Sequence, residues 1–373
     1  MITFAHNSLE LPAIGFGCMG LGGRYEREDQ NDKAAQSIIR LAYELGVRFF
    51  DTAEVYGAGH GEEVLGQAVK GLGKDVFISS KFSASHAAAK DVKTACENSL
   101  KRLDRDHIDL YQCHWPNPDV PFEETLGALD DLRTCGKIRY VGFSNVTSAQ
   151  LAELKKLCPA GLDVVSAQQD YSLVERFCEH RILPYCQEND VTLIAYSPLG
   201  QGKVDLSGAR AAVLHDLAST HGVTQYAVML AWVIHARNVM AIPMTQNPDH
   251  LRANMTALDV SLKEDEYEAL SDAFALNVAE IDTDRIEVLT SHTGKSFKTR
   301  KEAEQNTLNL SPSPMKLAEE LKIGEMLKPV KIREHPEKKG FYQLYEGQLR
   351  FWGWVIAHDG KKPIAALIEK KKL

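Results

Sequence analysis

Short apolar segments recur along the first 275 residues, each closing on polar side chains, and stretches with helical periodicity separate them. There are eight such segments, at residues 13–17, 48–52, 76–81, 108–114, 139–144, 164–169, 192–197 and 239–244. A strand followed by a helix, repeated about every 30 residues, is typical of parallel strands joined by right-handed crossovers. Eight units have the size of a closed barrel, so we predict an α/β fold, a (β/α)8 TIM barrel. An open doubly wound sheet is the alternative that this count disfavours.

A barrel of this kind carries its chemistry where the strands end and the loops begin. The polar residues of this sequence follow that rule, since Asp51 closes the second segment, Lys81 the third and His114 the fourth. The next three segments also close on polar side chains, namely Ser144, Asn145, Gln168, Tyr196 and Ser197. We therefore expect a functional site at this end of the barrel.

Three glycines in and just after the first segment, Gly15, Gly17 and Gly20, fit the spacing of a dinucleotide-binding fingerprint. That fingerprint needs a helix directly after its third glycine, so that a phosphate meets the helix N-terminus. Here the helical pattern begins only near Asp32. We interpret the glycines as turn residues that let the first strand bend close to a ligand, and not as a Rossmann fold.

The composition is that of an ordinary globular protein, 44% hydrophobic and 25% charged, which excludes disordered and collagen-like classes. No apolar run approaches the roughly 20 residues that span a bilayer, and the first residues lack a signal-peptide pattern. The seven cysteines form no CxxC pair, which favours reduced thiols over a disulfide framework or a metal site. We expect a cytoplasmic protein with neither a membrane nor a metal partner.

The net charge of −8 is unevenly distributed. Residues 1–277 carry 25 basic and 37 acidic side chains, a net charge of −12, whereas residues 278–373 carry 18 and 14, a net charge of +4. The change of sign predicts a domain boundary near residue 277. The alternative is a solvated basic tail.

Four residues at the ends of adjacent strands, Asp51, Tyr56, Lys81 and His114, form a candidate catalytic group. Each alone has a structural explanation, such as a helix cap for Asp51 or a core imidazole for His114. Together, Lys81 held by Asp51 would place a positive charge beside the Tyr56 phenol, and we expect this charge to lower the pKa of the phenol. Tyr56 would then protonate a carbonyl oxygen that receives hydride at carbon, while His114 hydrogen-bonds that oxygen.

Several motifs support this interpretation, and they occur in the order FFDTAEVYGAGHGEEVLGQAV, ISSKF, RLDRDHIDLYQCHWP, GKIRYVGFSN, QQDYSLVER, AYSPLGQG and AIPMTQNPDHLRANM. In order and spacing, residues 1 to about 275 resemble the aldo-keto reductases. The resemblance implies a (β/α)8 barrel that binds NADP(H) across its mouth and interconverts a carbonyl and an alcohol by hydride transfer. It also implies that the catalytic tetrad of the family is Asp51, Tyr56, Lys81 and His114.

The same resemblance implies a set of cofactor contacts. Ser144, Asn145 and Gln168 would hold the nicotinamide carboxamide, and Tyr196 would stack on the nicotinamide ring. Ser197, Leu199 and Gly200 would line the pyrophosphate path. The adenosine end would be surrounded by Thr245, Gln246, Asn247, His250 and Asn254.

The sequence departs from the family at the adenosine end. Many members place Lys and Arg where this chain has Met244 and His250, and in those members both cations contact the 2′-phosphate. A neutral imidazole binds phosphate less strongly than a bidentate Arg. NADP(H) stays the favoured cofactor, and NAD(H) is the open alternative.

The C-terminal region has a different pattern. Short strands predicted at Pro329–Arg333, Phe341–Tyr345 and Ile364–Ile368 surround a helix that begins near Gly347, which indicates a small α+β unit over residues 278–373. The layout of LKPVKIR, YQLYEGQLRFWGW and KPIAALI resembles the ParB/sulfiredoxin-like superfamily. The predicted architecture is therefore a barrel fused to a second domain.

The second resemblance implies that a nucleotide phosphate binds at the start of that helix. Gly347, Gln348 and Arg350 would lie near the phosphate of ATP, ADP or CTP, with Arg333 as a second cation. Gln348 stands where sulfiredoxin needs a cysteine, which excludes sulfinic acid repair. The Glu-Arg-Arg of the ParB type becomes Gln-Leu-Arg here, which places its nucleotidase chemistry in doubt.

The leading hypothesis is an NADP(H)-dependent reductase of a small carbonyl substrate, fused to a nucleotide-binding module. Alternatives are a reductase with a second, phosphotransferase activity and a regulatory protein that senses its cofactor. The C-terminal region would otherwise be a lid or a dimerisation module, which leaves a homo-oligomer open. Nucleic acid is a disfavoured partner because a net charge of +4 gives a weak field.

Overall fold

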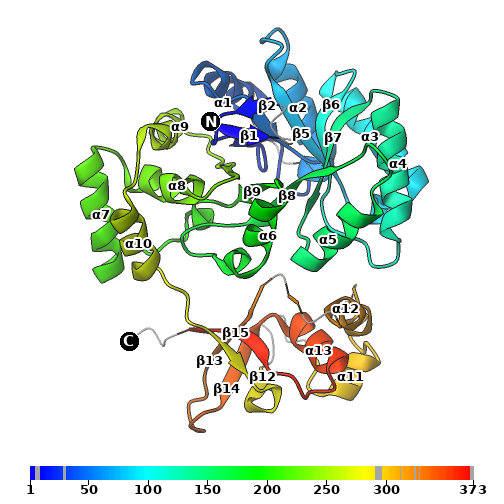
Figure 1. The fold of residues 1–373 in the computed structure, drawn as a ribbon, viewed down its shortest axis with the longest axis vertical. Coiled ribbons are helices and arrows are strands. Elements are labelled where there is room, and N and C mark those ends of the chain that lie inside the picture. Colours follow the sequence, from blue (N-terminus) through cyan, green and yellow to red (C-terminus); the bar gives the residue numbers. More distant parts are fainter. Residues whose placement is uncertain are drawn as a thin grey trace. The chain divides into compact units, whose positions relative to one another are not determined.

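The computed structural model describes residues 1–4, 9–27, 31–289, 296–310, 312–322, 325–326 and 328–369. The chain divides into two compact units, Met1–Ala275 and Leu276–Leu373. Each unit has a hydrophobic core of its own. Figure 1 shows the first unit in blue to yellow and the second in yellow to red.

The first unit is a closed barrel of parallel strands. The strands follow one another around the barrel in chain order: β3 (Phe16–Gly17), β4 (Phe49–Asp51), β5 (Phe77–Phe82), β6 (Ile108–Cys113), β7 (Ile138–Ser144), β8 (Val164–Asp170), β9 (Thr192–Tyr196) and β10 (Val239–Ala241). The ring closes where the Gly15 amide donates to the Ala241 carbonyl oxygen at 2.8 Å and Ile14 pairs with Ala241. The predicted (β/α)8 barrel is confirmed, and all eight predicted strands occur.

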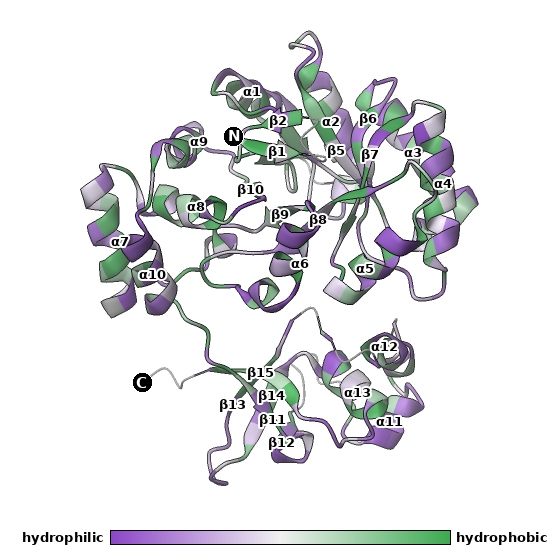
Figure 2. Cartoon of the chain, in the orientation of Figure 1, coloured by the Kyte–Doolittle hydropathy of each residue, from purple (hydrophilic) through white to green (hydrophobic). Residues whose placement is uncertain are grey.

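Helices cover the outside of the barrel, and Figure 2 shows hydrophobic and hydrophilic residues alternating around them. The helices are α1 (Asp32–Glu44), α2 (His60–Val69), α3 (Ala89–Leu103), α4 (Phe122–Thr134), α5 (Ser148–Leu157), α6 (Ile182–Glu188), α7 (Gly208–His221), α8 (Gln225–His235), α9 (Pro248–Met255) and α10 (Glu264–Ala273). In α1 the buried residues are Ala35, Ile38, Ile39 and Ala42, the spacing of one helical face. Within the described ranges, no helix is long and apolar enough to cross a membrane.

A short hairpin, β1 (Ile2–Phe4) and β2 (Leu9–Leu11), plugs the N-terminal end of the barrel. The fully buried Phe4 ring lies 6.5 Å from the ring of Phe49 and 5.5 Å from that of Phe77, between centroids. Phe49 and Phe77 are the first residues of β4 and β5, so the hairpin seals the end opposite to the predicted site. The sequence pattern does not predict this hairpin.

The second unit is a five-stranded mixed sheet with helices. The strand order is β11 (Val278–Ile281), β15 (Ile364–Glu369), β13 (Val330–Glu334), β14 (Tyr342–Glu346) and β12 (Ile286–Val288). The helices are α11 (Arg300–Glu304), α12 (Pro314–Leu321) and α13 (Gln348–Ala357). Phe351, Trp352 and Trp354 of α13 are buried in the core of this unit, so these aromatic residues are structural.

Candidate active site

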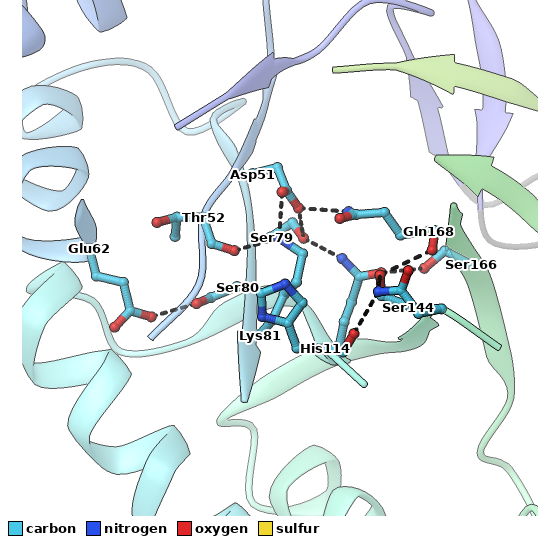
Figure 3. A network of polar contacts seen from close by, with 12 residues as sticks. Asp51, Thr52, Glu62, Ser79, Ser80, Lys81, His114, Ser144, Ser166 and Gln168 are labelled. Atoms are coloured by element: carbon cyan, nitrogen blue, oxygen red, sulfur yellow. Dashed lines mark hydrogen bonds and ion pairs between the residues drawn. The ribbon is translucent and has the colours of Figure 1, made fainter. Parts of the chain in front are cut away.

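The centre of the site is a buried ion pair between neighbouring strands (Figure 3). Lys81 Nζ donates to Asp51 Oδ1 at 2.5 Å and to the Thr52 carbonyl oxygen at 2.8 Å. Lys81 is fully buried and Asp51 is 2% exposed, so each charge is balanced inside the protein. Burial alone favours the neutral amine, but the contacts with Asp51 and Tyr56 outweigh it and raise the pKa of Lys81. The lysine is therefore an ammonium at neutral pH.

The Asp51 carboxylate is also held by a second residue of β5 and by a residue of β8. Its Oδ2 accepts hydrogen bonds from Ser79 Oγ and Gln168 Nε2, both at 2.9 Å. With the bond from Lys81, three donors surround a carboxylate at the end of β4. The side chain has little freedom to rotate, so the position of the Lys81 charge is fixed with it.

A layer of polar side chains below Asp51 was missed by the sequence analysis. Gln112 Nε2 donates to Ser79 Oγ at 2.8 Å, and Ser166 Oγ donates to Gln112 Oε1 at 3.3 Å. Gly142 leaves room for this second bond, because a Cβ there would lie 2.1 Å from Ser166 Oγ. A signal was present in the sequence: these polar residues lie inside otherwise apolar strands, two positions before a predicted site residue.

Tyr56 begins the short 3-10 helix η1 (Tyr56–Gly59), directly before α2. Its ring centroid lies 5.1 Å from Lys81 Nζ and 5.7 Å from the centroid of the His114 ring, which meets it edge-on. The chain turns sharply after Tyr56, and Gly57 has a φ of +58°. A Cβ at Gly57 would lie 2.0 Å from the Gly22 carbonyl oxygen, so this turn requires glycine.

The pKa of Tyr56 corrects one prediction. Burial is the largest influence on the phenol and raises its pKa, Lys81 acts in the opposite direction, and the net pKa lies above the usual value. The expectation of a lowered pKa was wrong because the sequence indicates the nearby cation but not the depth of burial. The phenol is therefore protonated at neutral pH and available as a proton donor.

His114 follows β6 and is partly buried beside Tyr56. Burial and the positive charge of Lys81 lower the pKa of His114 to about 3. The imidazole is thus neutral over the physiological range. A neutral ring that carries one N–H can donate a single hydrogen bond without bringing a second positive charge into the site.

The residues expected at the nicotinamide join this hydrogen-bonded group, and Figure 3 labels two of them, Ser144 and Gln168. Ser144 Oγ donates to the Gln168 carbonyl oxygen, and Asn145 Nδ2 donates to Ser144 Oγ and to the His114 carbonyl oxygen, each at 3.0 Å. Tyr196 Oη donates to Asn145 Oδ1 at 2.9 Å. The structure therefore brings these four predicted residues together with the tetrad, as a set of neutral amides and hydroxyl groups.

The residues expected at the adenosine end belong to a separate turn, after β10. The backbone amide of Asn247 donates to Thr245 Oγ1 at 3.1 Å. Asn247 Oδ1 caps α9 by accepting from the backbone amides of Asp249 and His250. Gln246 Nε2 donates to the Gly20 carbonyl oxygen at 3.2 Å. Asn254, also predicted at the adenosine end, lies on α9. The residues predicted for the pyrophosphate path follow β9 and are Ser197, Leu199 and Gly200.

The four predicted phosphate-binding residues lie in the second unit. Gly347 precedes α13 with a φ of +94°. Arg350 Nη1 donates to the Lys328 carbonyl oxygen at 3.3 Å, and a Cβ on Gly347 would meet Arg350 Nη2 at 2.9 Å. Gly347, Gln348 and Arg350 thus share one turn, and Arg333 is exposed on β13. In the described part of both units, no group of three or more His, Cys, Asp or Glu could hold a metal ion.

The sequence model of the Aldo/keto reductase family matches residues 13–274 of this chain. The chain belongs to the aldo/keto reductase family. The methylglyoxal reductase YeaE of Escherichia coli strain K12 is 37% identical over 276 residues, which cover 74% of this chain and 94% of that protein. The predicted aldo-keto reductase enzyme is confirmed, and the family match ends within the first unit.

Solved structures of aldo/keto reductases agree with the fold. The thermostable aldo-keto reductase Tm1743, solved with the inhibitor epalrestat, is 38% identical with a TM-score of 0.69, covering 72% of this chain and 98% of its own. The aldo/keto reductase of Klebsiella pneumoniae, solved with NADP and acetate, is 33% identical with a TM-score of 0.68, covering 73% and 94%. Both place this chain among enzymes that share the barrel.

Proposed function

We propose that this chain reduces the carbonyl group of a small aldehyde or ketone to an alcohol with NADPH, and that Tyr56 donates the proton. The observation that carries the proposal is the buried group at one end of the barrel, in which the Tyr56 phenol lies against both the Lys81 ammonium and the His114 ring. A protonated phenol, a fixed cation and a neutral N–H donor are what a carbonyl oxygen needs as negative charge develops on it.

Each residue has a distinct part in this chemistry. The bound cofactor supplies hydride to the carbonyl carbon. Tyr56 gives its proton to the carbonyl oxygen, and Lys81 stabilises the phenolate that remains. Asp51 holds the Lys81 ammonium in place, and His114 donates a hydrogen bond to the same carbonyl oxygen. In the oxidative direction the phenolate of Tyr56 takes the proton back from the alcohol.

The residues at the barrel mouth fit the cofactor unevenly. The neutral set of Ser144, Asn145 and Gln168 suits a carboxamide, which is itself uncharged and carries both donors and acceptors. At the adenosine end, Met244 is exposed and apolar, and His250 is the group that stands where many family members have an arginine. We therefore propose NADPH as the preferred cofactor with NADH as a competent second one.

The proposed substrate is a small reactive aldehyde such as a 2-oxoaldehyde. This follows the name of the E. coli relative, a methylglyoxal reductase. Trp115, which directly follows His114, is 47% exposed and offers an apolar surface next to the tetrad. An uncharged substrate of a few carbons suits a tetrad that has the rings of Tyr56, His114 and Trp115 beside it.

The test is multiple-turnover oxidation of NADPH with methylglyoxal. We expect Tyr56→Phe to abolish turnover and to leave the dissociation constant for NADPH unchanged, because the ring remains and only the proton is lost. Tyr226→Phe is the matched control, since Tyr226 is an exposed tyrosine on α8. Turnover that survives in Tyr56→Phe would refute the proposed role. A wild-type protein that binds NADPH but turns over no carbonyl would support the cofactor-sensing alternative.

We further propose that the second unit is a ParB/sulfiredoxin-like module that binds a nucleotide phosphate where α13 begins. Its support is the order strand, Gly347, helix, strand in one mixed sheet, with the Arg350 guanidinium over the glycine. Thermal unfolding of the full chain with ATP, ADP or CTP tests this, since a ligand at 100 times its dissociation constant adds about 2.7 kcal/mol. An unfolding temperature that rises with one of these nucleotides supports the nucleotide-binding module. Release of ADP from ATP in the presence of small hydroxy compounds would support the phosphotransferase alternative. A response to NADPH alone favours a lid or a dimerisation module.

A reducing, cytoplasmic location is part of the proposal. All seven cysteines are unpaired, and Cys18 and Cys113 are buried near the tetrad. Burial raises the pKa of Cys113 to about 12, which makes its thiolate scarce and the thiol unreactive. Fractionation of cells that produce the protein would test the location directly.

A further inference from the structure

A second buried carboxylate lies next to the active site, on the outer side of the barrel wall (Figure 3). Glu62, in the first turn of α2, is fully buried. Its Oε1 accepts a hydrogen bond from Ser80 Oγ at 2.5 Å, and its Oε2 accepts one from Arg102 Nε at 2.6 Å. The carboxylate therefore joins three elements: α2, strand β5 and helix α3.

Ser80, the partner of Glu62 on β5, directly precedes Lys81. Side chains alternate between the two faces of a strand, and the hydrogen bonds follow that alternation. Ser79 and Lys81 point into the barrel and bind Asp51, whereas Ser80 points outward and binds Glu62. Glu62 thus fixes β5 from outside, one residue before the ammonium.

Arg102, the partner of Glu62 on α3, is adjacent to the turn that carries Tyr56. Gly59 precedes α2 with a φ of +96°, and a Cβ there would lie 2.8 Å from Arg102 Cδ. A Cβ on Gly61 would lie 3.2 Å from Tyr56 Cβ. The backbone that follows Tyr56 therefore packs directly on the Arg102 side chain that Glu62 holds.

We propose that Glu62 is a positioning residue for the reaction: through Ser80 and Arg102 it fixes the Tyr56 turn relative to Lys81, and so sets the approach of phenol to ammonium. This rests on the proposed function, in which those two groups move the proton. Glu62 touches neither; it acts through the strand that carries Lys81 and the turn that carries Tyr56. Small displacements of reacting groups have large effects on rate.

The sharpest test is Ser80→Ala, which removes one hydroxyl and leaves the Glu62–Arg102 pair intact. We expect kcat to fall about tenfold, because the Tyr56–Lys81 geometry relaxes, while KM for the carbonyl and the dissociation constant for NADPH stay within about twofold. The basic limb of the kcat profile for reduction should move to higher pH, because a weaker Lys81 contact leaves burial to raise the pKa of Tyr56 further.

Three further variants complete the test. Thr125→Val removes another buried hydroxyl, one that donates to the Ala87 carbonyl oxygen at 2.8 Å on the α4 side of the barrel, and should change neither kcat nor the basic limb. Glu62→Gln can accept from Arg102 Nε with its oxygen and donate its amide to Ser80 Oγ, so it should keep most of the wild-type rate. Glu62→Ala severs both links and should show at least the defect of Ser80→Ala if it folds.

The outcomes distinguish a failure of the positioning role of Glu62 from a failure of the proposed function. If Ser80→Ala matches Thr125→Val in kcat and in the basic limb at equal NADPH affinity, Glu62 only stabilises the fold and the inference is wrong. If Tyr56→Phe still turns over, the proposed function itself fails, whatever Ser80→Ala does. A slow Ser80→Ala with a shifted limb, an inert Tyr56→Phe and an active Glu62→Gln support the inference.

Discussion

The ion pair at the centre of the site makes a quantitative prediction for Asp51→Asn. The variant keeps the shape of the side chain and can still accept from Lys81, but it removes the negative charge. Lys81 is fully buried, so the change leaves an uncompensated cation in the barrel interior. We expect both the stability of the first unit and the chemical step to suffer, each for a separate reason.

The stability loss follows from the burial of the pair. Removing one partner of a buried ion pair costs about 3–5 kcal/mol. For a folded unit of this size, each kcal/mol lowers the melting temperature by roughly 2–4 °C, so we expect a decrease of about 6 °C or more. The rate loss follows from the pKa of Lys81, because without Asp51 burial favours the neutral amine, which stabilises the Tyr56 phenolate far less.

The pH dependence of the melting temperature tests whether Asp51 keeps Lys81 charged in the folded protein. In the wild type the folded-state pKa of Lys81 lies above its unfolded value, so its contribution to stability is complete below about pH 10 and is lost only above it. In Asp51→Asn the folded-state pKa falls below the unfolded one, and the unfolded chain then binds more protons. The melting temperature of the variant should therefore rise between pH 6 and pH 9, whereas in the wild type Lys81 contributes no pH dependence over this range.

Asp104→Asn is the matched control, because it makes the same chemical change in a second Lys–Asp pair. Lys70 Nζ lies 2.8 Å from Asp104 Oδ2, with both side chains more than two thirds exposed. We expect no measurable change there. Adding Lys81→Met to Asp51→Asn should restore stability and not activity, because it removes the unpaired charge. Equal melting temperatures for Asp51→Asn and Asp104→Asn, or parallel pH curves for Asp51→Asn and wild type, would contradict the argument.

Three further predictions concern single positions. His114→Gln should lower kcat about a hundredfold, because the hydrogen bond to the carbonyl oxygen is lost. In the wild type, kcat/KM should not change near pH 6.5, because burial and Lys81 lower the pKa of His114 to about 3. A change in kcat/KM near pH 6.5 that disappears in His114→Gln would contradict this pKa. Met244→Lys should raise the preference for NADPH over NADH about fivefold or more at low salt, and an unchanged ratio would exclude this position from phosphate binding. Gly57→Ala should lower the unfolding free energy by about 2 kcal/mol or more and abolish turnover, because its Cβ meets the Gly22 carbonyl oxygen. Gly71 is the control, since it has a φ of +82° but nothing within 4 Å of a Cβ, so Gly71→Ala should lower the unfolding free energy only by the cost of its backbone conformation and leave turnover unchanged.

The sequence identified the barrel because each strand is a short apolar run that closes on a polar side chain. That pattern located Asp51, Lys81 and His114 on neighbouring strands, and strand order in a barrel then brings them together. It missed the support of the tetrad. Ser80 and Arg102 lie 18 and 40 residues from Glu62, and their meeting depends on how α2 and α3 pack on β5, which periodicity does not determine.

The direction of the Tyr56 pKa was mispredicted for a related reason. A motif indicates which charges surround a group, but desolvation depends on how completely the fold covers it. Tyr56 is only 7% exposed, and this burial outweighs the cation beside it. The hairpin at the opposite end of the barrel was missed because its two strands have three residues each, too few to show a period.

Strand β5 explains how one short sequence serves both the chemistry and its support. In Ser79-Ser80-Lys81 the first and third side chains enter the barrel and meet Asp51, while the second leaves it and meets Glu62. A shift of the strand by one residue would reverse every one of these contacts, since the side-chain period is two. The two buried carboxylates therefore select one register for β5 from opposite faces. The position of the Lys81 ammonium is fixed by the same contacts, so the register of the strand and the geometry of the proposed proton transfer are one structural property.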